Sequence, residues 1–199
     1  MSPLTTQAIG NFLQYYESDL YYIQQFQRYK SGENTLCYTE KRKGSFYTFL
    51  TEFRVIRNFK EGKTQIILEK TIEWLNYNCN SNDVDSFALK LYETGITHNK
   101  IPVSMASKIL FLNDPYNIIP MDRLARLTLN QKENNYSTYQ KNLQQFKFEK
   151  KQEITKCLEI IMPLIKKINN SYGELPYLDK IAEQRIIDKI LWVTGKSKL

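Results

Sequence analysis

Apolar residues recur at three- and four-residue steps along most of this chain, and no useful length of it alternates apolar and polar residues as a strand does. The pattern is clearest in residues 5–29, where one face carries Ile9, Phe12, Tyr16, Leu20 and Ile23. Only seven glycines and six prolines occur among 199 residues, too few for the many tight turns of a β-sandwich. The periodicity predicts an all-α fold of about eight helices.

Helices are expected at residues 5–29, 45–59, 63–77, 86–94, 136–167 and 177–193, with two short helices around a hairpin and a further one opened by Pro120-Met121-Asp122. Asp83 or Asp85 is expected to cap the helix over 86–94, and Gly95 to follow its last turn in a left-handed conformation. Pro163 is expected to kink or end the helix over 136–167.

The length fits one compact domain over residues 1–199, and a division into 1–80 and 81–199 is the alternative. No run of 18 apolar residues and no apolar leader segment occurs, so we expect a cytoplasmic protein without a membrane partner. The cysteines Cys37, Cys79 and Cys157 lie far apart, and His98 is the single histidine. This spacing does not predict a zinc site, and no glycine-rich loop predicts a nucleotide cofactor, so we expect neither metal nor cofactor.

Basic residues outnumber acidic ones by 28 to 21, which gives a net charge of +7. Such an excess suits an anionic partner, either nucleic acid or an acidic protein surface. Charge alone does not choose between them, because lysine- and asparagine-rich chains are also common where coding sequences are rich in A and T. DNA is the partner we expect, and a protein partner is the alternative.

The stretch from Gly95 to Leu129 holds the most specific pattern in the chain, because a hairpin between two short helices is followed by Pro120-Met121-Asp122 at the start of another helix. This stretch resembles the active-site half of the helix-hairpin-helix DNA glycosylases. In that family a hairpin with a G-x-G turn presents backbone N–H groups to a DNA phosphate. The matching segment here, residues 100–106, contains no glycine, so its hairpin departs from the family pattern.

The same resemblance assigns a catalytic role to Asp122, the aspartate of the family's proline-x-aspartate turn. It also places Ser104 where glycosylases of the 8-oxoguanine type have a nucleophilic lysine. Lys108 stands four residues after Ser104 and therefore on the same helical face, where it can replace the missing amine. Without a lysine nucleophile, the resemblance implies a monofunctional enzyme that excises a base with Asp122 alone.

The resemblance further implies DNA contacts and a pocket for an extruded base. The DNA-contacting candidates are Lys100, Ser104, Arg123, Arg126 and His98, and the aromatic candidates for the base pocket are Phe111 and Tyr116. For most of the candidate residues, a purely structural role is the alternative. Asp122 fits an ordinary helix N-cap, Lys108 fits a pair with Asp114 or Asp122, and the two arginines fit a solvated helical face.

The segment from Arg185 to Trp192 is similar to the end of glycosylase-like proteins found beside bacterial antiviral genes. Its simplest reading is an ion pair between Arg185 and Asp188, three residues apart, with Trp192 in the core. Three hypotheses follow: a DNA glycosylase, a catalytically inactive DNA- or protein-binding component of an antiviral defence system, and an all-α module that recognises a protein through its tyrosine-rich first helix. That helix carries adjacent tyrosine pairs, 15–16 and 21–22, of which at least one member each must face away from the core.

Overall fold

A computed structural model describes residues 1–33, 38–55, 62–97 and 100–199 of the chain, and every regular element in these ranges is a helix. The nine helices are α1 (Pro3–Lys30), α2 (Phe46–Glu52), α3 (Lys63–Tyr77), α4 (Val84–Glu93), α5 (Val103–Asn113), α6 (Arg123–Thr128), α7 (Tyr136–Glu149), α8 (Lys151–Ser171) and α9 (Leu178–Lys196). The predicted all-α class is confirmed. None of these helices is long and apolar enough to cross a membrane.

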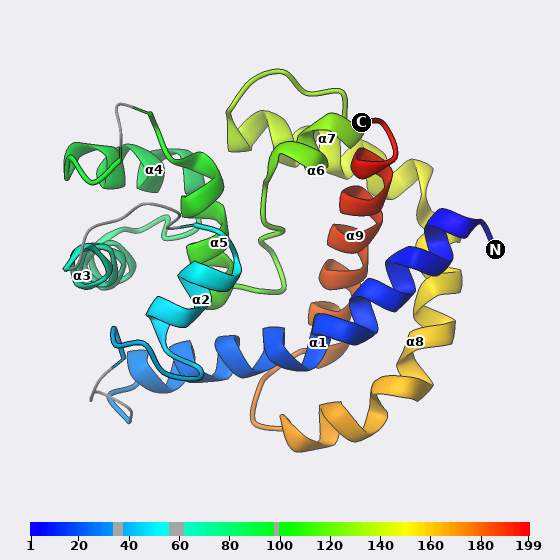
Figure 1. Cartoon of the computed structure of the whole chain (residues 1–199), viewed down its shortest axis with the longest axis horizontal. Helices are drawn as coiled ribbons and strands as arrows, with labels where there is room; N and C mark the ends of the chain where they lie inside the picture. The colour runs from blue at the N-terminus through cyan, green and yellow to red at the C-terminus, as the bar shows by residue number, and fades with distance from the viewer. Residues whose placement is uncertain (34–37, 56–61, 98–99) are drawn as a thin grey trace.

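The helices form two groups that share α1 (Figure 1). Helices α2 to α5 gather around the C-terminal half of α1, whereas α6 to α9 lie with its N-terminal half. The most extensive packing joins α1 to α9 and α6 to α9. A chain segment between α5 and α6, residues 118–122, runs through the middle of the molecule between the two groups. Its position makes this segment, called the strap below, the structural link between them.

Helix α1 forms as its sequence predicts. The Ser2 hydroxyl accepts a hydrogen bond from the Thr5 N–H at 3.1 Å, and a proline occupies the first turn, where its missing N–H costs nothing. Within the two tyrosine pairs, Tyr16 and Tyr22 are buried while Tyr15 is exposed and Tyr21 only partly buried. The expectation that one member of each pair faces away from the core is confirmed for Tyr15, whereas Tyr21 packs against the edge of the core.

The start and end of α4 also follow the local signals. Asp83 is the N-cap residue and accepts from the Ser86 N–H at 3.0 Å, while Gly95 follows the last turn with φ +70°. Asp85 has a different role, because its carboxylate accepts from the backbone N–H groups of Tyr136 at 2.7 Å and Ser137 at 2.9 Å. It therefore ties the start of α7 to α4.

Two predicted helix boundaries are wrong. Helix α2 ends at Glu52 instead of residue 59, and Arg54 already has a left-handed backbone with φ +54°. The helix predicted over 136–167 is divided at Lys150 into α7, which packs on α4, and α8, which packs on α1 and α9. These partners lie in different directions, so tertiary packing sets the break. Helix α8 continues through Pro163, which is exposed, so the carbonyl that it leaves unbonded faces water.

Candidate functional site

The strap is held in place by three buried side chains from two helices. The Ser107 hydroxyl of α5 accepts a hydrogen bond from the Met121 N–H at 3.0 Å. From α7, the Tyr136 and Tyr139 hydroxyls donate to two strap carbonyls at 3.0 and 3.3 Å. Because buried backbone groups must find partners, these bonds fix both the path of the strap and the residue at its end, Asp122.

Asp122 is the N-cap residue of α6. Its Oδ1 accepts from the Ala125 N–H at 2.8 Å, so the capping interpretation is confirmed. Burial raises the pKa of this carboxyl above its ordinary value and the charge of Asp188 raises it further, against the N–H of Ala125 and the positive charge of Lys108. The carboxylate therefore stands in surroundings that disfavour its ionised form.

Helix α6, which carries Asp122 at its start, is fastened to α9. Gly195 of α9 lies directly against the backbone of α6, where a Cβ would collide with the Leu124 carbonyl oxygen. The Thr128 hydroxyl donates to the Leu191 carbonyl at 2.6 Å, and the Lys198 ammonium donates to two carbonyls of the last turn of α6 at 3.2 Å each. Asp122 is therefore positioned from α5, α7 and α9 together.

Lys108 projects from α5 toward the same region. Its Nζ donates to the Phe53 carbonyl oxygen at 2.9 Å, and its charge lowers the pKa of Asp122. The alternative partner, Asp114, is buried and accepts hydrogen bonds from Asn82 at 2.5 Å and from Asn117 at 2.9 and 3.1 Å. Lys108 and Asp122 thus lie within electrostatic range of each other, although they come from different elements.

A buried charge cluster lies behind this pair. Arg185 of α9 is only 2% exposed; its Nε donates to Asp19 Oδ2 of α1 at 2.7 Å, and its Nη1 lies 3.2 Å from Asp188 Oδ2. Burial alone would lower the pKa of this guanidinium, but Asp19 and Asp188 raise it above its ordinary value. The guanidinium carbon is 4.9 Å from the centroid of the Phe111 ring. The predicted ion pair of Arg185 with Asp188 is confirmed, and Asp19 is an additional partner.

Two residues of the site that were not predicted, Asp19 and Ser107, do have a signal in the sequence. Asp19 interrupts the apolar face of α1 one position before Leu20, and a lone carboxylate on a buried face needs a cation as its partner. Ser107 is the single hydroxyl on the apolar face of α5 that it shares with Val103, Ala106 and Leu110. No short-range pattern marks Tyr136 and Tyr139, since their hydroxyls act on a segment 17 and 19 residues earlier in the sequence.

The candidate DNA-contacting residues have different surroundings. Lys100 and Arg123 are exposed, while Ser104 is half-buried and its carbonyl accepts from the Ser107 hydroxyl at 3.0 Å. Arg126 donates to two backbone carbonyls of the loop after α6, at 3.0 and 3.3 Å, and so braces that loop. His98 lies outside the described residues.

The two aromatic candidates are separated. Phe111 has no exposed surface, and its ring packs against the guanidinium of Arg185, so in this conformation no base can stack on it. Tyr116 is partly exposed; its ring meets Tyr177 edge-on at 5.5 Å between centroids, with the Lys180 ammonium 6.0 Å from the ring centre. Only Tyr116 offers an accessible aromatic face.

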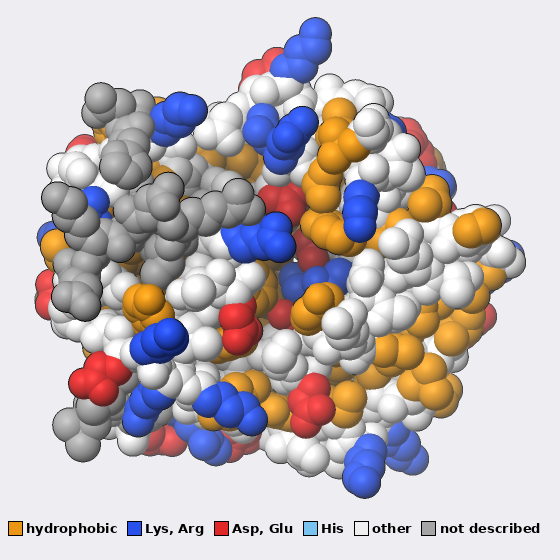
Figure 2. Space-filling view, in the orientation of Figure 1, with side chains coloured by type: hydrophobic (Ala, Val, Ile, Leu, Met, Phe, Trp, Pro, Cys, Tyr) orange, Lys and Arg blue, Asp and Glu red, His pale blue; other side chains and the backbone are white. Residues whose placement is uncertain are grey.

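Charged side chains gather on the face of the molecule over the strap (Figure 1 and Figure 2). Figure 2 shows acidic and basic side chains meeting in a hollow near the middle of this face, where Figure 1 places the strap between α5 and α9. Among the described residues, no group of three or more histidine, cysteine, aspartate or glutamate side chains is arranged to hold a metal ion. The groups that the structure does bring to this region are the Asp122 carboxylate and the Lys108 amine, whose charge acts on that carboxylate.

Comparison of the chain with models of protein families, with curated proteins and with solved structures finds no match in any of the three. The resemblance to helix-hairpin-helix glycosylases therefore stays a prediction from the residues of the central segment.

Proposed function

We propose that this protein binds DNA and excises a base, with Asp122 as the catalytic carboxylate and Lys108 as the neighbouring amine. One observation carries the proposal. The two residues belong to different elements, one within α5 and one before α6, and the fold brings their charges within electrostatic range. The strap that carries Asp122 is also held by three buried hydrogen bonds, the kind of rigid support that a catalytic group needs.

The electrostatic cost at Asp122 supports a role beyond capping. Asparagine and serine cap helices about as well as aspartate does, and neither carries a charge. Here an ionisable group is retained although burial and Asp188 both disfavour its ionised form. Carboxyls with perturbed pKa values beside a specific charged partner are typical of functional sites.

The proposed reaction needs few groups. The bond between the deoxyribose C1′ and the base nitrogen breaks, its electron pair leaves with the base, and positive charge develops on the sugar. The ionised Asp122 carboxylate stabilises this cation and orients a water molecule. The water oxygen adds to C1′, its proton is released, and the departing base takes up a proton, so the overall reaction is a hydrolysis. The positive charge of Lys108 helps to keep Asp122 ionised.

Binding to DNA rests on charge. The net charge of +7 and the exposed Lys100 and Arg123 on the two sides of α5 in the sequence suit a phosphate backbone. A complex with several phosphate contacts must weaken steeply with added salt. Duplex binding measured between about 50 and 200 mM salt tests this, and an affinity that does not change with salt contradicts it.

The catalytic proposal is tested with duplexes that carry oxidised, deaminated, alkylated or phage-type modified bases. Asp122→Asn should abolish base release while it keeps the cap. Asp83→Asn is the matched control, because Asp83 caps α4 through an equivalent bond to the N–H three residues on. Loss of release in both variants would attribute the effect to folding, and release by Asp122→Asn would exclude the carboxylate mechanism. Borohydride trapping that disappears in Lys108→Ala would assign a covalent step to the amine.

A catalytically inactive binding protein is the second candidate, and one observation favours it. The Lys108 amine already donates to the Phe53 carbonyl, and the Asp122 carboxylate already caps α6, so both groups contribute to holding the fold. An accessory component of an antiviral defence system would need no more than this. Salt-sensitive DNA binding without release of any base, in wild type and variants alike, would favour this candidate.

A further inference from the structure

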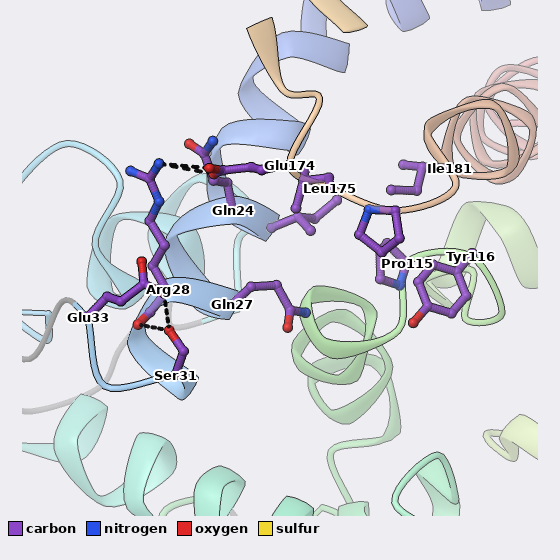
Figure 3. Close-up of a pocket in the computed structure, with 12 residues that line it drawn as sticks. Gln24, Gln27, Arg28, Ser31, Glu33, Pro115, Tyr116, Glu174, Leu175 and Ile181 are labelled. Atoms are coloured by element: carbon purple, nitrogen blue, oxygen red, sulfur yellow. Dashed lines mark hydrogen bonds and ion pairs between the residues drawn. The ribbon is translucent and has the colours of Figure 1, made fainter. Parts of the chain in front are cut away.

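A separate pocket of about 390 Å³ opens between the C-terminal half of α1, the turn after α5 and the loop before α9 (Figure 3). Its lining includes Ile23, Gln24, Arg28, Tyr116, Glu174 and Ile181. We call it the α1 pocket. Its size suits a small organic molecule.

The α1 pocket and Asp122 lie on opposite sides of the buried ion pair of Arg185 with Asp19. Ile23 follows Asp19 by one turn of α1, and Ile181 precedes Arg185 by one turn of α9. On the other side of the pair, Asp188 contacts Arg185, and its charge acts on Asp122. The ion pair therefore separates two sites, and no lining residue of the α1 pocket belongs to the proposed catalytic group.

The pocket has a polar end and an apolar end. Figure 3 shows Arg28, Glu174 and Gln24 together on one side, and Pro115, Tyr116 and Ile181 on the other. Arg28 and Glu174 form an ion pair with a separation of 3.0 Å that bridges α1 and the loop before α9. A ligand that fills the pocket must therefore combine a flat or apolar body with a polar edge.

Gln24 supplies the most specific group at the polar end. Its side chain is only 9% exposed, yet its amide makes no hydrogen bond to any residue that the structure describes. Neighbouring Gln27, in contrast, donates to two carbonyls at the end of α5 at 2.9 and 3.1 Å. The Gln24 amide is not among the fully buried polar groups that lack a partner, so it is open to the pocket, where it offers a donor and an acceptor side by side.

The charges of the lining define the ligand further. Arg28 pairs with Glu174, and the Glu33 carboxylate, which accepts from the Ser31 hydroxyl, also lines the pocket. Arg28 and the two glutamates carry an excess of one negative charge, which disfavours phosphate. A glutamine amide pairs in a bidentate way with the adenine edge formed by the 6-amino group and N7. The ring of Tyr116 provides a face for stacking at the opposite end.

We propose that the α1 pocket binds an adenine base, with the Gln24 amide paired to its 6-amino and N7 edge and its ring against the apolar end. The base enters without its phosphate, either as free adenine or adenosine or as an unstacked base of a DNA strand. This is a binding site in addition to the proposed catalytic one, and it does not depend on base excision.

Calorimetric titration of the full chain with adenosine, AMP, guanosine and thymidine tests the proposal. Adenosine should bind most tightly, AMP several-fold more weakly at low salt, and thymidine and guanosine not measurably. Single strands with one central adenine or thymine distinguish the second source: a preference for the adenine strand that exceeds the affinity for adenosine identifies a base within DNA. Absence of both adenosine binding up to about 10 mM and any adenine preference would overturn the proposal.

Gln24→Leu should weaken adenosine binding about tenfold or more, because it removes the bidentate pair. The variant should melt within a few degrees of wild type without ligand, which shows that it folds. Gln152→Leu, in a different pocket near the start of α1, is the matched control and should bind like wild type. Adenosine affinity unchanged in Gln24→Leu would contradict the assignment.

Discussion

The starts of α4 and α6 are built alike and differ in what surrounds them. Asp83 and Asp122 each accept a hydrogen bond from the backbone N–H three residues on, at 3.0 and 2.8 Å. The cap of α4 also receives the Ser86 hydroxyl at 2.8 Å, in an exposed setting. The cap of α6 stands instead at the end of the buried strap, beside Lys108 and Asp188. A helix N-cap motif thus identifies a structural role, and the surrounding charges must be known before a chemical role is assigned.

The largest loss of stability near the start of α6 should follow from breaking the buried ion pair of Arg185 with Asp19. Arg185→Met leaves Asp19 buried without its cation, and we expect the free energy of unfolding to fall by about 3–5 kcal/mol. Urea denaturation measures the loss. The double variant Arg185→Met with Asp19→Leu removes the stranded carboxylate and should recover most of the stability; no recovery would mean that packing around Phe111, and not charge, is what Arg185 provides.

A smaller loss should follow from disturbing α6 alone. Gly195→Ala places a methyl group against the Leu124 carbonyl, so α6 must move, and we expect a loss of about 1–3 kcal/mol. Gly10→Ala is the matched control, because Gly10 also lies in a helix and has no atom near its missing Cβ. That variant should gain about 0.5–1 kcal/mol. Equal effects of the two substitutions in urea denaturation would show that α6 adjusts without cost.

The smallest effect should be a pH dependence specific to Asp122. Its pKa is raised above the ordinary value of 3.8 in the folded state, so the native protein binds more protons than the unfolded chain above that pH, and ionisation of Asp122 costs stability as the pH rises. Asp122→Asn keeps the cap, so it should be more stable than wild type at pH 7 and equal to it at about pH 3. Asp83→Asn should stay within about 0.5 kcal/mol of wild type at pH 7.

Thermal melts of both variants across this pH range make the measurement. A stability gain for Asp122→Asn that is independent of pH would contradict the assigned cause, because a change of packing does not titrate.

Local patterns predicted the helices well, because a buried helical face repeats every three to four residues wherever it packs. Asp83, Gly95 and the pair of Arg185 with Asp188 follow from such short-range rules. The division at Lys150 does not, since it is set by which helices α7 and α8 meet.

The same limit applies to the candidate site. Lys108 and Asp122 were predicted from the sequence, but the groups that fix their positions come from remote parts of the chain. Ser107 reaches a backbone N–H 14 residues away, and the α7 tyrosines act across a loop. The Gln24 amide has no signal in the sequence, because which polar groups line a pocket is a property of the folded molecule.

The ion pair between Asp19 and Arg185 also constrains the order in which the chain folds. The two residues are 166 positions apart, so a ribosome must add nearly all of the described chain before α1 can meet α9. Neither charge enters the interior favourably by itself, because each needs the other to offset its lost hydration. Docking of α1 on α9 is then a late and cooperative event. Until it occurs, the part of the apolar face of α1 that α9 covers stays open to chaperones on the nascent chain.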